Sequence, residues 1–200
     1  MNTFKYDERA MNYLRKRDPK LAKVIDEIGF IARPVENDLF TALISSIVSQ
    51  QISTKAAQTV FGRLESLVQV VTPEKILERT DDEIKSCGLS YRKVGYMKGI
   101  CEAVISGALN LDGLKLLRDE AVIAELVKLN GIGVWSAEML LIFSLERPDV
   151  LSYGDLVIRK GLMKLHGLDE LSKQDFAKYK TLYAPYGSIA SFYLWALAND

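Results

Sequence analysis

Asp155 is the acidic residue whose position is best suited to catalysis. It follows Gly154 and precedes an apolar pattern with helical spacing, which predicts that it begins a helix. The positive end of the helix dipole favours an ionised carboxylate, the form that can stabilise a cationic transition state. An aspartate here is also an ordinary helix N-cap, and the two interpretations are compatible.

A second candidate is the turn Gly131-Ile132-Gly133. The pattern predicts a helix ending at Leu129, a tight turn whose glycines permit positive φ and close backbone approach, and a new helix from about Val134. Unpaired backbone N–H groups at the start of that second helix suit a phosphate oxygen. An ordinary connection between two helices has the same pattern, so the turn alone does not establish a binding site.

Two adjacent glutamines form a third candidate. Gln50 and Gln51 interrupt two apolar helical faces, which indicates a turn between helices that faces either a ligand or only solvent. Both interpretations stay open on these residues alone.

Composition restricts the cofactors. Cys87 and Cys101 are the two cysteines, too few for a four-cysteine iron–sulfur cluster, and we expect both to be reduced and buried. The single histidine, His166, disfavours a zinc site. The 26 basic and 26 acidic residues give zero net charge, so the whole molecule does not attract nucleic acid, although basic residues can gather on one face. We expect no required cofactor.

The sequence also predicts where the chain works. No apolar run reaches the roughly 18 residues that span a bilayer, and residues 1–17 are charged throughout. We therefore expect neither a transmembrane segment nor a signal peptide, no membrane partner, and a cytoplasmic or otherwise intracellular location.

Almost every apolar pattern is helical, so we predict an all-α fold of about ten helices with short connectors. The only strand-like stretch is Leu67–Val71. Helix starts are predicted at Thr72, at Thr80 with a capping box, and at Ser90. We expect two helical lobes, 36–150 carrying the hairpin and 1–35 plus 151–200 closing an active-site cleft beside residues 150–155.

In combination these patterns resemble the helix-hairpin-helix DNA glycosylases, and within them the 3-methyladenine DNA glycosylase II branch. The resemblance rests on the Leu126–Ala137 hairpin, an aspartate 22 residues after its second glycine, and the upstream Ser49–Ser53 turn. It extends from about Phe40 to Trp195 and departs at Gly187, where many relatives have arginine. It implies a two-lobed monomer that excises a damaged base from double-stranded DNA, nucleoid-associated if bacterial.

The resemblance implies that Asp155 is the catalytic carboxylate. Some family members have in the hairpin a lysine that attacks the sugar, and Trp135 occupies that position here, so no AP lyase activity is expected. Trp135, Trp195 and, less directly, Tyr153 match aromatic positions that line the base pocket, where rings favour cationic alkylated purines such as 3-methyladenine and 7-methylguanine. Both tryptophans could instead be core residues.

For DNA binding, the resemblance implies that Gln51 fills the gap left by the extruded base, although Gln50 could equally meet DNA. Lys93 and Arg159 are possible phosphate contacts, or else solvated surface residues. The hairpin resembles those that bind a monovalent cation, Na⁺ or K⁺, which would involve the backbone carbonyls of Val127, Leu129 and Ile132.

Three alternatives stay open. A glycosylase for oxidised or deaminated bases would need hydrogen-bonding groups directed at the base edge. A non-catalytic helix-hairpin-helix module would bind DNA for another protein, but has no need of Asp155 or of the two tryptophans. A helical protein without a nucleic-acid role would agree with the neutral net charge.

Overall fold

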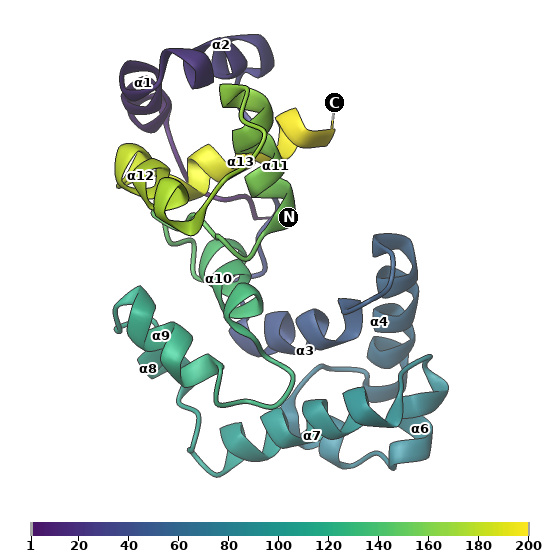
Figure 1. Cartoon of the computed structure of the whole chain (residues 1–200). Coiled ribbons are helices and arrows are strands. Elements are labelled where there is room, and N and C mark those ends of the chain that lie inside the picture. Colours follow the sequence, from purple (N-terminus) through teal and green to yellow (C-terminus); the bar gives the residue numbers. More distant parts are fainter. Residues whose placement is uncertain (1, 200) are drawn as a thin grey trace. The chain divides into compact units, whose positions relative to one another are not determined.

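The computed structural model describes residues 2–199, and its regular secondary structure is helical (Figure 1). Within this range the extended pairing is limited to an isolated antiparallel bridge between Thr3 and Pro34. The all-α fold class predicted from the sequence is therefore confirmed.

The chain divides into two compact units. Unit 2 is the continuous segment Glu36–Leu140, and unit 1 combines the segments before and after it. The expected middle lobe ran to residue 150, whereas residues 141–150 belong to unit 1. The second boundary thus falls inside helix α10 (Val134–Phe143) rather than after it.

Unit 2 contains the remaining helices of the middle of the chain: α3 (Leu39–Ser49), α4 (Thr54–Val68), α5 (Pro73–Leu77), α6 (Asp81–Ser86), α7 (Tyr91–Ile105), α8 (Leu111–Leu114) and α9 (Asp119–Leu126). The three predicted helix starts are confirmed. Thr72 and Ser90 accept backbone N–H bonds as N-caps, and Thr80 forms a complete capping box with Glu83.

One ambiguous stretch of unit 2 is resolved by the structure, and one local expectation was wrong. The strand-like stretch Leu67–Val71 is not a strand, because α4 continues to Val68, whose buried side chain lies one turn after Leu64 on the same apolar face. The helix before the hairpin ends at Leu126 rather than Leu129. Residues 127–130 continue as tighter turns, in which the N–H of Leu129 reaches back three residues to Leu126.

Unit 1 is built around a close crossing of two helices. Its helices are α1 (Glu8–Arg17), α2 (Pro19–Ile28), α11 (Leu156–His166), α12 (Lys173–Tyr183) and α13 (Gly187–Asn199). Gly161 of α11 lies against the backbone of Leu194 in α13, and any Cβ there would overlap the Leu194 carbonyl oxygen. The missing side chain therefore allows α11 to approach α13 closely.

The segment that leads into α11 is fixed on the start of α13. The hydroxyl of Ser188 donates to the carbonyl of Arg147 (2.6 Å) and accepts from the N–H of Val150 (2.9 Å). The hydroxyl of Ser191 donates to the carbonyl of Gly187 at 2.8 Å and also lies 3.2 Å from the carbonyl of Val150. These bonds explain why residues 147–150 belong to unit 1.

Asp18 links three helices of unit 1. It caps α2 by accepting from the N–H groups of Lys20 (2.9 Å) and Leu21 (3.3 Å). The hydroxyl of Tyr183 donates to the same carboxylate at 2.7 Å, and His166 Nε2 lies 3.2 Å from it. Burial and the bond to Asp18 raise the pKa of Tyr183 far above its usual value, so the hydroxyl keeps its proton as a donor.

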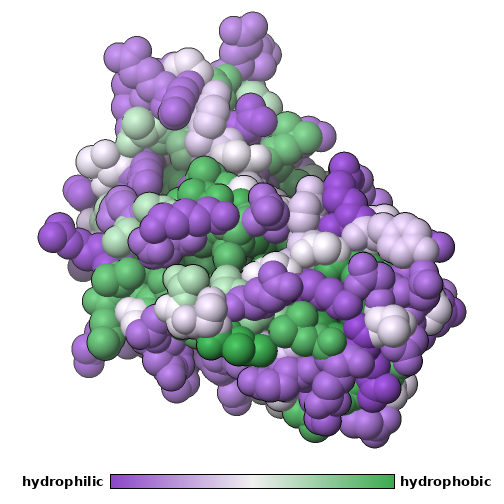
Figure 2. All heavy atoms as spheres, turned by 90° about the horizontal axis from the view of Figure 1, so that it is seen from below, coloured by the Kyte–Doolittle hydropathy of each residue, from purple (hydrophilic) through white to green (hydrophobic). Residues whose placement is uncertain are grey.

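The surface is mixed in character. Figure 2 shows hydrophobic side chains in small groups interrupted by hydrophilic ones on one face of the molecule. Exposed large apolar residues come from separate elements, among them Leu116, Val134 and Leu156, as is normal for a folded protein. Within residues 2–199, no helix has the length and hydrophobicity needed to cross a bilayer.

Replacing Asp18 with alanine should cost far more stability than the same change at Asp7. Asp7 caps α1 with the same two-bond pattern but is exposed, so Asp7→Ala should lower the free energy of unfolding by about 1 kcal/mol. Asp18→Ala also removes the 2.7 Å bond of the buried Tyr183 hydroxyl and leaves it only the longer contact with His166 Nε2 at 3.4 Å, which adds about 1–3 kcal/mol. Urea denaturation of both variants measures the difference, and equal losses would contradict the role given to Asp18.

Candidate functional site

Asp155 is the N-cap of α11, and the residue is only 6% exposed. Its Oδ1 accepts from the N–H groups of Val157 (2.8 Å) and Ile158 (2.9 Å). Backbone donors at a helix start offset the cost of burying a carboxylate and fix its direction. The arrangement holds a negative charge in place, as a group that stabilises a developing cation requires.

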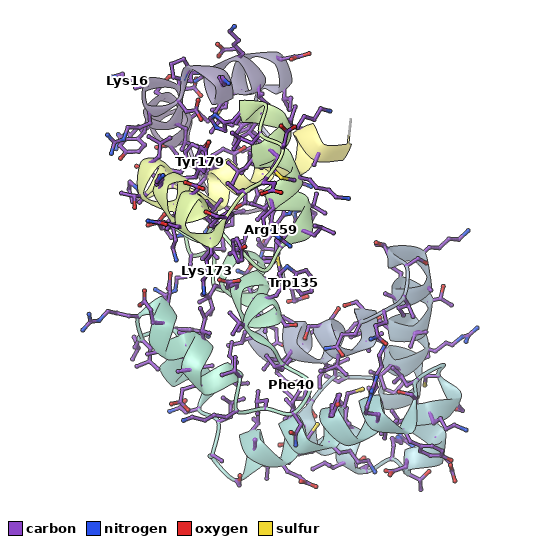
Figure 3. All side chains as sticks on the ribbon, in the orientation of Figure 1. Lys16, Phe40, Trp135, Arg159, Lys173 and Tyr179 are labelled. Atoms are coloured by element: carbon purple, nitrogen blue, oxygen red, sulfur yellow. The ribbon has the colours of Figure 1, made fainter. Side chains whose placement is uncertain are left out.

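Tyr153 and Arg159 lie together beside the start of α11. The guanidinium carbon of Arg159 lies 5.1 Å from the centre of the Tyr153 ring, and that ring forms a T-shaped pair with Phe176, with 5.2 Å between centres. Arg159 is labelled in Figure 3, and it is half-buried rather than a solvated surface residue. The contact orders both side chains next to the segment that carries Asp155.

Trp195 belongs to an aromatic stack in unit 1. Its ring is nearly parallel to those of Phe143 and Phe192, with centres 5.6 Å and 6.1 Å away. The guanidinium carbon of Arg33 lies 6.0 Å from the centre of the indole. Trp195 is half-buried, so it both contributes to packing and retains accessible surface.

Trp135 is the second residue of α10 and is 48% exposed (Figure 3). This exposure rules out the interpretation of Trp135 as a core residue. A large, partly exposed ring next to the hairpin is available for contact with a flat ligand.

The predicted hairpin connects α9 to α10, and α10 begins at Val134 as expected. Gly131 has a φ of 89°, which only glycine adopts readily. It also packs against the ring of Tyr96, and an added Cβ would lie 2.8 Å from the ring carbon Cγ and 3.0 Å from Ile47. Gly133 is different, because it is exposed and has nothing within 4 Å of such a Cβ.

The two glutamines have different environments. Gln50 donates from Nε2 to the carbonyl of Gly131 at 2.8 Å, so its side chain is used inside unit 2. Gln51 has an exposed side chain and a backbone φ of 59°, the left-handed region that non-glycine residues rarely adopt. The side chain available to a ligand is therefore that of Gln51.

Lys93 is not a solvated surface residue. It is half-buried, and its ammonium donates to the carbonyls of Val48 (2.8 Å) and Gln50 (2.7 Å). Burial lowers its pKa below the usual lysine value. Two of the three ammonium N–H groups are thus used within the protein.

Most of the predicted site residues lie in local groups within one unit or the other. In unit 2, Gln50, Lys93 and Gly131 are joined by hydrogen bonds around the exposed Gln51. In unit 1, the start of α11 groups Asp155 with Tyr153 and Arg159, while Trp195 lies in the aromatic stack of α13. The expected cleft between the lobes stays a prediction.

Sequence reasoning missed several residues near these groups. Tyr96 supports the hairpin and Arg33 lies over the Trp195 ring, but both come from segments far away in the sequence. The departure at Gly187 has a local reason. Its N–H donates to Asp149 Oδ1, and an added Cβ would lie 3.0 Å from that oxygen, so an arginine would require the carboxylate to move.

We searched the described residues for side chains grouped to bind a metal ion. Residues 2–199 contain no group of three or more His, Cys, Asp or Glu side chains arranged to hold an ion. Cys87 and Cys101 are buried and form no disulfide, and burial raises the pKa of Cys101 to about 12. Val127 is the C-cap of α9, where carbonyls lack helical partners, and such oxygens suit a hard cation.

Comparison with known proteins gives consistent results. The family model described as HhH-GPD superfamily base excision DNA repair protein matches residues 44–183. The chain is similar to DNA-3-methyladenine glycosylase 1 of Schizosaccharomyces pombe, with 39% identity over 161 residues, 78% of this chain and 71% of that protein.

Two solved structures are similar over most of their length. The crystal structure of a DNA-3-methyladenine glycosidase from Bacillus halodurans has a TM-score of 0.88 and 36% identity, with 99% of this chain and 93% of that chain covered. A Schizosaccharomyces pombe 3-methyladenine DNA glycosylase in complex with abasic DNA has a TM-score of 0.83 and 36% identity, with 94% and 95% covered.

Gly131→Ala should destabilise the protein, whereas Gly133→Ala should not. Alanine at 131 must adopt a positive φ and displace the ring of Tyr96, which should lower the free energy of unfolding by about 1–3 kcal/mol. Alanine at 133 meets open space in an ordinary backbone conformation and should change it by less than about 0.5 kcal/mol. Urea denaturation compares the two, and an undisturbed Gly131→Ala would exclude the tight contact.

Proposed function

The chain belongs to the HhH-GPD superfamily of base excision DNA repair proteins, and we propose that it is a DNA glycosylase that removes alkylated purines from double-stranded DNA. The observation that carries this proposal is its similarity, at 36% and 39% identity, to proteins named as 3-methyladenine DNA glycosylases. One of those relatives is bound to abasic DNA, the kind of product that base removal leaves.

The substrates that we propose are 3-methyladenine and 7-methylguanine. Both bases are cationic when attached to deoxyribose, so they are good leaving groups and attract the faces of aromatic rings. Trp135, Trp195 and Tyr153 are the rings proposed to line the pocket. Trp135 and Trp195 both retain accessible surface, which a pocket wall requires.

The reaction is hydrolysis of the N-glycosidic bond. The bond between C1′ and the base nitrogen breaks, its electron pair leaves with the base and neutralises the cation, and water adds to C1′. The carboxylate of Asp155 stabilises the positive charge on the sugar and positions the water, whose proton passes to solvent. Fixed charge of this kind contributes about 3 kcal/mol to lowering a barrier.

The reaction stops at the abasic site. A lyase reaction requires an amine that attacks C1′ to form an imine, and the hairpin position that carries a lysine in some relatives is Trp135 here. An indole nitrogen is not a nucleophile under these conditions. We therefore propose a monofunctional enzyme.

The hairpin Gly131–Gly133 is proposed to bind the DNA backbone. Exposed Gly133 allows close approach to the N–H groups at the start of α10, which suit a phosphate oxygen. A monovalent cation, Na⁺ or K⁺, held by the carbonyls of Val127, Leu129 and Ile132 would supply positive charge that the neutral chain lacks. Arg159 is a further proposed phosphate contact.

Gln51 is proposed to enter the base stack when the damaged nucleotide leaves it. Extrusion of a nucleotide costs a few kcal/mol, and filling the gap recovers part of this cost. The exposed side chain of Gln51 is free to do so, while that of Gln50 is bonded to Gly131. This difference favours Gln51 over Gln50.

Asp155→Asn should abolish most base release while preserving the fold, because asparagine is also a good N-cap. We expect release of 3-methyladenine from methylated duplex DNA to fall by at least about 100-fold. Strand breaks in the wild-type reaction should appear only after hot alkali, which cleaves abasic sites.

The matched control is Asp7→Asn, the same substitution at an exposed N-cap of α1, which should keep full activity. Normal turnover by Asp155→Asn would remove that carboxylate from the mechanism. Breaks before alkali would contradict the monofunctional assignment. Release of oxidised or deaminated bases alone would favour the alternative substrates, and DNA binding without any release would favour a non-catalytic module.

Trp195→Ala should reduce release of cationic alkylpurines by about tenfold while affecting a neutral substrate such as hypoxanthine less. Trp195→Phe keeps an aromatic face next to Phe143 and Phe192 and should retain most activity. Single-turnover rates for 3-methyladenine and hypoxanthine give the ratio of release of the cationic base to release of the neutral one, for each variant. Equal rates for wild type and Trp195→Ala would mean that the indole serves only the packing of the stack.

A further inference from the structure

One face of α7 supports both segments that are proposed to touch DNA. Lys93, in the first turn, binds the carbonyls of Val48 and Gln50 at the end of α3. Tyr96, three residues later on the same face, packs its ring against Gly131 of the hairpin. The turn after α3 and the hairpin therefore rest on neighbouring side chains of a single rigid element.

A third link closes this frame. The side chain of Gln50 donates to the carbonyl of Gly131 at 2.8 Å, joining the turn directly to the hairpin. The turn, the hairpin and α7 are thus connected in pairs within unit 2. Displacement of any one of the three requires a hydrogen bond to break or the Tyr96 contact to open.

The end of α3 explains why a lysine is needed. Helices commonly end with a glycine whose left-handed backbone satisfies the last carbonyls. Here the C-cap Gln50 has φ −56° and ψ 130°, and the left-handed residue is Gln51, for which that conformation is unfavourable. The ammonium of Lys93 supplies donors to two of these carbonyls and so holds Gln51 in its strained position.

The bonding of Lys93 argues against phosphate contact as its main role. Its side chain is half-buried, and its two bonds of 2.8 Å and 2.7 Å point into the protein. Neighbouring Arg92 is exposed and carries the same charge at the same end of α7. Substitution of Arg92 therefore shows the effect of losing a positive charge at this end of α7, and substitution of Lys93 shows in addition the effect of losing its two hydrogen bonds.

We infer that Lys93 is a positioning residue that fixes the Gln51 turn on the hairpin frame, so that nucleotide extrusion and backbone binding take place on one rigid body. The inference rests on the proposed function, because it assigns Gln51 to the base stack. Gln50 completes the frame, and its amide acts on the hairpin rather than on DNA.

The test uses four variants of the full chain. Lys93→Met removes the donors but keeps the length of the side chain, and Lys93→Arg keeps donors and charge. Arg92→Met removes one positive charge beside the frame. Gln50→Leu breaks only the link to Gly131. If urea denaturation shows that Lys93→Met is not folded, Gln50→Leu still tests the inference.

Two measurements on duplex DNA distinguish the roles. The first is the fluorescence of 2-aminopurine beside a tetrahydrofuran abasic analogue, which reports unstacking without any base release. The second is affinity as a function of salt. We expect Lys93→Met and Gln50→Leu to reduce the unstacking equilibrium and single-turnover release of 3-methyladenine about tenfold. Lys93→Arg should restore most of both, and Arg92→Met should leave them unchanged.

A phosphate contact would behave differently. If Lys93→Met weakened binding and lowered the salt slope by about one without changing 2-aminopurine fluorescence, the inference would be overturned. It would also be overturned if Arg92→Met reduced unstacking as much as Lys93→Met. If wild type unstacked the duplex in a Lys93-dependent way but released no alkylpurine, the proposed substrate would fail and the positioning role would stand.

Discussion

Burial of the Asp155 carboxylate is the constraint around which unit 1 is arranged. A charge with so little exposure requires hydrogen-bond donors, and the first N–H groups of α11 provide them. The start of α11 is in turn fixed by the close crossing with α13 at Gly161 and by the serines that hold residues 147–150. A glycine and two serines with no chemical role therefore hold the segments on either side of Asp155.

In the proposed function, the geometry of unit 2 makes up for a missing electrostatic attraction to DNA. A chain with 26 basic and 26 acidic residues has no net charge to draw it to a polyanion. Backbone N–H groups at a helix start bind phosphate only when the turn before them has a defined shape. The packing of Gly131 on Tyr96 and the hydrogen bonds of Gln50 and Lys93 supply that shape. In the proposed function, specific contacts therefore take the place of long-range attraction.

Helices and their capping residues were predictable from the sequence, whereas contacts between distant segments were not. Helical periodicity and capping residues such as Thr80 gave the elements, because both signals lie within a few residues. The N-cap position of Asp155 followed in the same way. The partners of Gln50 and Lys93 lie 81 and 43–45 residues away, so their roles could not be read from spacing. Leu67–Val71 was ambiguous because short apolar runs fit either helix or strand.

Unit 1 is built from two segments that are far apart in the sequence, and this affects its folding during synthesis. Tyr183 and Asp18, which share a hydrogen bond, are 165 residues apart, so α1 and α2 leave the ribosome long before α11, α12 and α13 exist. At typical translation speeds the wait is roughly ten seconds. During it unit 2, being continuous, can fold, while Leu14, Leu21 and Ile25 lack their final partners. The nascent chain therefore carries two amphipathic helices whose apolar side chains stay uncovered until the second half of unit 1 has been made.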